Sequence, residues 1–152
     1  MKFTVKRIYD KDFSPNDFRV LIDRLWPRGI AKLEAHIALW EKDITPSSEL
    51  RTRYHHAEIT YPEFAQQYAQ ELQQNTSLVQ DFLQKIANQK EVVLVTAVKD
   101  IEHSHIPVLL NVLEQKYSLT HKKMRAVWLS FTLFLNYLNI LENELLIFTS
   151  NP

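Results

Sequence analysis

The chain has 152 residues, equal numbers of basic (18 Lys plus Arg) and acidic (18 Asp plus Glu) residues, no cysteine and one glycine. This length suits one domain with a hydrophobic core, and the balanced charge argues against a general nucleic-acid binder, which would show a basic excess. The absence of cysteine excludes disulfides, thiolate metal sites and a cysteine nucleophile, and it fits a cytoplasmic protein. A single glycine excludes the glycine-rich phosphate loops of Walker and dinucleotide-binding proteins. The first residues lack the long apolar core of a secretory signal, so we expect none.

Two strands are predicted near the N-terminus. Phe3–Ile8 alternates apolar and polar residues, as a strand with one wet face does, and the aliphatic run Arg19–Leu25 predicts a buried strand. About nine residues connect them, fewer than the dozen or more that a parallel crossover normally needs. The spacing therefore leaves two alternatives, an antiparallel pair or an unusually compact turn of helix.

A helix and a shorter helix are predicted next. The first covers Ala31–Lys42, because its apolar residues fall on one helical face: Leu33, Ile37 and Trp40. The second begins after Ser47, whose hydroxyl is a good N-cap. We expect a loop at Tyr54–His56.

The middle of the chain carries the clearest periodicity. Tyr61–Gln74 and Thr76–Asn88 have apolar stripes at helical spacing. Glu91–Val98 holds a continuous β-branched run, which suits a strand buried on both faces. After a loop at Lys99–His105, Ile106–Lys116 predicts another helix, with proline in its first turn.

The segment Ala126–Phe148 predicts a long apolar helix, with one stripe made of Val127, Phe131, Phe134, Leu138, Leu141 and Leu145. Its apolar run falls short of the about 20 residues that span a bilayer. Glu142 and Glu144 follow that run, and each carboxylate near the bilayer centre costs about 2.5 kcal/mol or more. The pattern favours a helix that docks on the domain, on a twin helix in a homodimer or on a protein partner, over a tail anchor.

Together these elements predict an α/β fold, with a small, partly parallel sheet of three or more strands surrounded by helices. The sheet is expected to contain Phe3–Ile8, Arg19–Leu25 and Val92–Val98. The predicted domain covers residues 1–116, and residues 117–152 form an apolar helical extension.

A cluster of charge marks the end of the second predicted strand. Asp23, Arg24, Trp26 and Arg28 lie within six residues, and ligands of open α/β sheets bind outside the carboxyl ends of strands. Because guanidinium groups bind phosphate and carboxylate bidentately, we expect a small anionic ligand. The predicted ligand-binding residues are Arg24, Trp26, Arg28, Lys42, Arg51, Lys99 and Ser104.

A structural interpretation competes with this one. The arginines would pair with carboxylates and connect loops, and the protein would be a non-enzymatic interaction domain. The expected carboxylates are Asp23, Asp43 and Glu49. Trp26 would then fill the core, as buried aromatic side chains usually do, and Ser104 would cap the helix at Ile106. Nucleic-acid binding through a local basic patch is a third alternative.

Catalytic residues are not defined by spacing. Asp23 and Asp100 are candidate general bases, but a carboxylate beside arginine is held ionised, which favours a stabilising partner over an acid. Ser104 as a nucleophile would need a base, and none is recognisable. No histidine pair has the i, i+4 spacing of a metalloprotease. We therefore expect no metal and no cofactor, and the pattern is compatible with a binding site and with an enzyme.

Three strings of the sequence resemble the YeaO-like family, small bacterial proteins of unknown function: Lys6–Asp10, Val20–Ile30 and Leu39–Arg51. The resemblance covers about residues 3–116 and implies a compact α/β domain with no established activity. More distant relatives have Cys and Arg where this chain has Ser104 and Ile106, so any chemistry of that cysteine is not carried over. The apolar tail after Tyr117 has no counterpart in the family.

Overall fold

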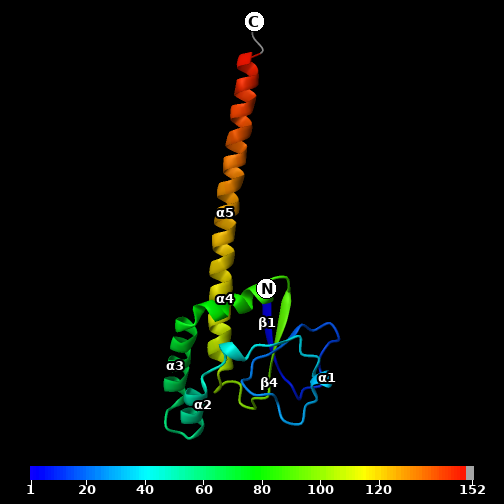
Figure 1. Cartoon of the computed structure of the whole chain (residues 1–152), viewed down its shortest axis with the longest axis vertical. Helices are drawn as coiled ribbons and strands as arrows, with labels where there is room; N and C mark the ends of the chain where they lie inside the picture. The colour runs from blue at the N-terminus through cyan, green and yellow to red at the C-terminus, as the bar shows by residue number, and fades with distance from the viewer. Residues whose placement is uncertain (150–152) are drawn as a thin grey trace. The chain divides into compact units, whose positions relative to one another are not determined.

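The computed structural model describes residues 1–149 of the chain. It consists of two units, one formed by residues 1–115 and one that begins at Lys116. The first unit contains a four-stranded, wholly parallel sheet with the strand order β1-β4-β2-β3. In this sheet β1 and β4 lie side by side (Figure 1). The strands are β1 (Lys2–Arg7), β2 (Arg19–Leu21), β3 (Leu39–Trp40) and β4 (Glu91–Thr96). The predicted α/β class is confirmed.

The central position of β4 follows from its sequence. Its β-branched residues are buried from Val92 to Thr96, so this strand is covered on both faces as predicted. Alternate residues of β4 face two separate hydrophobic clusters. Val92 and Leu94 pack in the larger cluster with residues of the helices, and Val93 and Val95 pack in the smaller one with Ala35.

The first two strands are not neighbours in the sheet, since β4 lies between them and pairs with both in parallel. Neither predicted alternative for their connection is correct, because residues 8–18 form turns and bends without a helix. The physical reason is burial. The most apolar strand, β4, lies inside the sheet, and β1, whose residues are only partly buried, lies at an edge.

The second strand is shorter than predicted and ends at Leu21 rather than Leu25. Ile22 N–H still donates to Val95 O at 3.0 Å, but no further ladder bond follows. From Asp23 onward a side chain replaces the backbone as the hydrogen-bonding partner of β4. The chain can therefore leave the sheet and form a loop.

The predicted helix over Ala31–Lys42 is wrong. Only α1 (Lys32–Ala35) is helical, and His36 ends it with a left-handed φ of 48°. The next residues form β3 and then the 3-10 helix η1 (Lys42–Ile44). β3 forms backbone hydrogen bonds with the outer edge of β2. A prediction from local helical spacing does not take these distant partners into account.

The bounds of the helices that follow agree better with the predicted bounds. α2 (Ser48–His55) begins after Ser47, whose Oγ accepts a hydrogen bond from Leu50 N–H at 3.2 Å, so the predicted cap is confirmed. The helix includes Tyr54 and His55, which corrects the predicted loop. α3 (Tyr61–Gln74) has the predicted bounds, and α4 (Thr76–Lys85) ends three residues earlier than predicted.

The last helix, α5 (Ile106–Thr149), is continuous, and in the first unit it buries Leu109 and Leu113. In the second unit Val127, Leu129 and Leu133 are 65–68% exposed. The other residues of the predicted apolar stripe, from Phe131 to Leu145, lie outside the described side chains. No helix in the described part of the chain has the length and apolarity that crossing a membrane requires.

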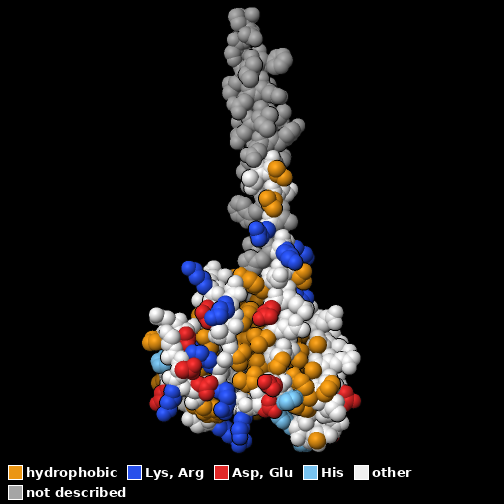
Figure 2. Space-filling view, turned by 180° about the vertical axis from the view of Figure 1, so that it is seen from behind, with side chains coloured by type: hydrophobic (Ala, Val, Ile, Leu, Met, Phe, Trp, Pro, Cys, Tyr) orange, Lys and Arg blue, Asp and Glu red, His pale blue; other side chains and the backbone are white. Residues whose placement is uncertain are grey.

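One face of the first unit has basic and acidic side chains intermingled around an apolar strip (Figure 2). This mixture agrees with the zero net charge of the chain. A surface that binds nucleic acid is basic over a whole face or stripe, and this face is not basic in that way.

Candidate functional site

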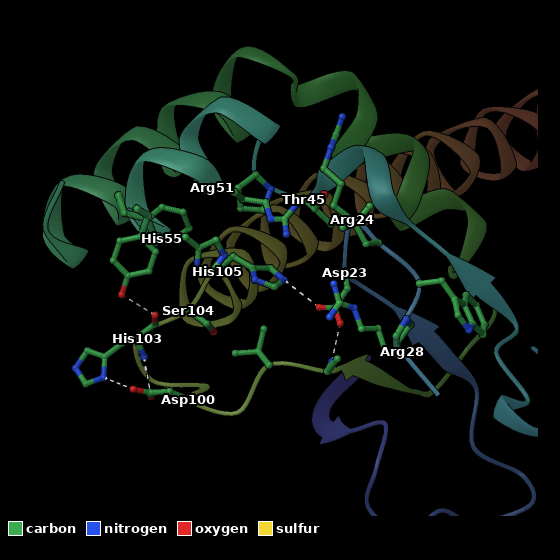
Figure 3. A pocket seen from close by; sticks show the side chains of 18 of the residues that line it. Asp23, Arg24, Arg28, Thr45, Arg51, His55, Asp100, His103, Ser104 and His105 are labelled. Atoms are coloured by element: carbon green, nitrogen blue, oxygen red, sulfur yellow. Dashed lines mark hydrogen bonds and ion pairs between the residues drawn. The ribbon is translucent and has the colours of Figure 1, made fainter. Parts of the chain in front are cut away.

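A cleft of about 610 Å³ opens at the carboxyl ends of the strands. Its walls come from the segments after β1, β2 and β4, from the two residues after η1, and from α2 and the start of α3 (Figure 3). Because the strands are parallel, these ends meet at one edge of the sheet, where α/β proteins bind ligands. Predicted site residues that line the cleft are Asp23, Arg24, Trp26, Arg28, Arg51, Asp100 and Ser104.

Asp23 connects two strand ends at the floor of the cleft. Its Oδ1 accepts a hydrogen bond from Thr96 Oγ1 and its Oδ2 accepts one from Ala97 N–H, both at 2.6 Å. Its backbone oxygen also accepts a 2.8 Å bond from Trp40 Nε1. Both carboxylate oxygens are occupied by donors of the fold, so the geometry describes a structural link rather than a free base.

In the described part of the chain, the arginines of the cleft are not paired with acidic side chains. Among the residues that the structure describes, no carboxylate lies within 4.0 Å of the guanidinium nitrogens of Arg24, Arg28 or Arg51. Arg24 Nε donates to Ser48 Oγ at 3.3 Å. In the view of Figure 3, Asp23 and His105 lie between Arg51 and Arg28. The pairing that the structural interpretation predicts is therefore not found.

His105, at the end of the predicted loop Lys99–His105, is buried in the site. Its Nε2 lies 2.8 Å from Ile22 O and 3.8 Å from Asp23 Oδ1. Burial lowers the pKa of His105, an effect that the Ile22 carbonyl and the Asp23 carboxylate oppose and the Arg51 charge reinforces. The neutral ring with a proton on Nε2 donates to the Ile22 carbonyl.

Asp100 and His103 form a pair on the loop after β4. Asp100 accepts a hydrogen bond from the His103 N–H at 3.2 Å, and its other oxygen lies 3.0 Å from His103 Nδ1. These bonds lower the pKa of the Asp100 carboxyl. Tyr54 Oη donates to His103 O at 3.0 Å, which ties this loop to α2.

Ser104 caps the start of α5. Its hydroxyl donates to Ile101 O at 2.6 Å and accepts from Ile106 N–H at 3.2 Å, and the residue is 6% exposed. The capping interpretation is confirmed. A hydroxyl with both roles occupied and little exposure is poorly placed to act as a nucleophile.

Trp26 packs partly inside the smaller hydrophobic cluster, with its ring edge-on to Trp40 at 5.5 Å. Its Nε1 donates to Ile30 O at 2.7 Å, so this indole closes a turn as well as lining the cleft.

Two predicted ligand-binding residues do not line the cleft. Lys42 lies over the Trp40 ring at 6.0 Å, and Lys99 is exposed. Lys42 is displaced because the helix expected to carry it is replaced by β3 and η1.

Several lining residues were not predicted: Tyr9, Thr45, Tyr54, His55, Phe64, His103 and His105. Tyr9 follows β1, and only the pairing of β1 with β4 brings it to the strand ends. The local sequence around Tyr9 does not predict that pairing. In the described part of the chain no cluster of three or more His, Asp or Glu could hold a metal ion.

Comparison with known proteins finds a matching family model and uncharacterized relatives. A family model described as "Inactive DUF488-N3 subclade" matches residues 2–127. An uncharacterized protein of Mycobacterium tuberculosis is 41% identical over 110 residues, which cover 72% of this chain and 91% of that protein. The uncharacterized protein YeaO of Escherichia coli is 38% identical over 109 residues, which cover 72% of this chain and 94% of YeaO. No solved structure matches the chain.

Proposed function

The chain belongs to the DUF488-N3i family, with YeaO among its relatives, and from that premise we propose that it binds a small anionic ligand in the strand-end cleft without transforming it. The observation that carries the proposal is the set of arginines that line the cleft without acidic partners among the described residues. Arg51 and Arg24 are half-buried, and a partly desolvated cation gains most from a bound anion.

The shape of the site supports a ligand role. A cleft of about 610 Å³ falls within the roughly 300–1,000 Å³ range of small-molecule sites, which combine apolar walls with a few converging polar groups. Arg28 comes from the loop after β2 and Arg51 from α2, so two independent elements present guanidinium groups to one space.

Binding without catalysis is supported by the groups that a reaction would need. Asp23 has both oxygens engaged by Thr96 and Ala97, and Ser104 is engaged in a helix cap. The family description also contains the word "inactive".

The test is thermal unfolding of the full chain with phosphate, sulfate or citrate at matched ionic strength, with chloride as the reference. At ten times the Kd, binding stabilises the folded state by about 1.4 kcal/mol, which raises the Tm by about 3–6 °C. Arg51→Ala and Arg28→Ala should each remove most of this shift.

Arg125→Ala is the matched control, because it deletes the same side chain from an exposed position of the second unit. It should keep the full shift. The proposal is overturned when no anion stabilises the wild type more than chloride does, or when Arg125→Ala loses as much as Arg51→Ala.

A further inference from the structure

The cleft is much larger than an inorganic anion needs. A water molecule occupies about 30 Å³ in the liquid, and a phosphate ion is only a few times larger, whereas the cleft measures about 610 Å³. Resting on the proposed function, we propose that the ligand is a phosphate monoester whose organic part is an aromatic ring. The phosphate binds Arg28 and Arg51, and the ring packs on Tyr54.

The arginines select the phosphate end. Arg28 and Arg51 each offer a planar fork of donors, and a dianion with three terminal oxygens can accept from both forks at once. A carboxylate has two oxygens and a single charge, so it can satisfy one fork. The acidic groups of the cleft do not compete for the arginines, because Asp23 is held by Thr96 and Ala97.

Tyr54 supplies a fixed aromatic wall. Its ring stacks on Phe64 with centroids 4.5 Å apart and planes inclined by 22°, and its hydroxyl is tied to His103 O. A ring that is already immobilised loses little side-chain entropy when a ligand packs against it. Tyr9 is a second such ring in the lining, 46% exposed, with its hydroxyl bonded to Arg28 O at 3.2 Å.

One helix presents both parts of the recognition. Arg51 and Tyr54 are three residues apart in α2, so they lie on the same helical face with about 5–6 Å between their Cβ atoms. Both residues line the cleft. This spacing suits neighbouring parts of one small molecule, with a charged group at Arg51 and a ring at Tyr54.

The distribution of charge along the cleft sets the orientation. Figure 3 shows Arg28 on one side of the site and Asp100 with His103 on the other. The Asp100 carboxylate repels a phosphate, and Tyr54 is bonded to the neighbouring His103. The ring therefore lies toward the loop after β4. Leu25, 67% exposed at the lining, offers further apolar surface that an inorganic ion would leave in water.

Isothermal titration of the full chain with inorganic phosphate, ethyl phosphate and phenyl phosphate tests this inference. Phenyl phosphate should bind about tenfold more tightly than the other two, because its ring adds an aromatic contact with Tyr54 to the apolar area that it buries. Tyr54→Leu should remove this preference and retain phosphate binding, whereas Tyr54→Phe should retain both. Arg51→Ala should weaken all three ligands.

Tyr61→Leu is the matched control, because Tyr61 contacts Tyr54 and Phe64 but does not line the cleft. It should keep the preference for phenyl phosphate. Equal affinity of wild type for the three phosphates overturns this inference and leaves the proposed function standing. Failure of all three to bind at matched ionic strength overturns this inference, and it overturns the proposed function as well when sulfate and citrate also fail to stabilise the fold. A preference that survives Tyr54→Leu overturns the assignment of the ring to Tyr54, and Tyr54→Met, which also lacks an aromatic ring, decides the question when the leucine variant does not fold.

Discussion

Asp23 and Thr96 lie 73 residues apart in sequence, yet the Thr96 hydroxyl donates a 2.6 Å hydrogen bond to the Asp23 carboxylate. The same carboxylate accepts the Ala97 N–H. This link holds the end of β2 against the end of β4, and it positions the loop that carries Arg24 and Arg28. The stability of the strand edge and the geometry of the cleft therefore depend on one side chain.

Asp23→Ala should destabilise the fold by about 3 kcal/mol, because it leaves a nearly buried hydroxyl and a backbone N–H without their acceptor. Urea unfolding measures the loss. Thr96→Val should cost less, since it leaves the bond from Ala97 N–H to Asp23, although Val98 N–H also loses its acceptor. The double variant should lose less than the sum of the single losses. Strict additivity would show that the two side chains do not act together.

The stability of the protein should fall as the pH drops below about 6.5, in part through His105. The pKa of this buried ring is lowered in the folded state, so the unfolded chain binds the proton more readily. The contribution of His105 is complete above the unfolded pKa and is lost as the pH falls through the folded pKa. Denaturant unfolding at pH 8 and pH 5 should show this loss.

His105→Gln should reduce the difference in unfolding free energy between pH 8 and pH 5, because the amide can still donate to the Ile22 carbonyl without titrating. His55→Gln, at an exposed position, should leave that difference unchanged. An unaltered difference in the His105 variant would exclude this histidine as a source of the pH dependence.

Gly29→Ala should destabilise the fold by about 1–2 kcal/mol through the backbone alone. Gly29 has a φ of 74°, and a Cβ placed there would meet no atom within 4 Å. The cost is therefore conformational strain and not a steric clash. Gly29→Asn should cost less, because asparagine tolerates the left-handed region. Equal losses for Ala and Asn in chemical denaturation would contradict this explanation.

We also propose that the apolar helix of the second unit mediates a homodimer. Exposed Leu129 and Leu133 lie one turn apart on α5, and apolar surface of this kind usually marks an interface. Light scattering should give twice the chain mass for the wild type and the chain mass for Leu129→Glu with Leu133→Glu. Ser130→Glu, an exposed control on the same helix, should stay dimeric. A monomeric wild type would contradict the dimer.

The sequence alone determined the elements whose signals are local. α3 has its predicted bounds because a capping box at Thr60 and Glu63, an early proline and a stripe of buried apolar residues all lie within one segment. β4 was recognisable as a doubly buried strand from its own β-branched run. The charged string from Asp23 to Arg28 likewise indicated the edge of the sheet where the cleft lies.

Only the tertiary structure decided the features that depend on partners distant in sequence. Trp40 lies at helical spacing from Leu33 and Ile37, but the open edge of β2 offers backbone hydrogen bonds that make Leu39 and Trp40 a strand. Tyr9 enters the site because β1 pairs with β4, and Arg51 remains without an acidic partner because the expected carboxylates lie elsewhere or are already engaged. Strand pairing and charge pairing arise between segments that only folding brings together, so no local pattern could record them.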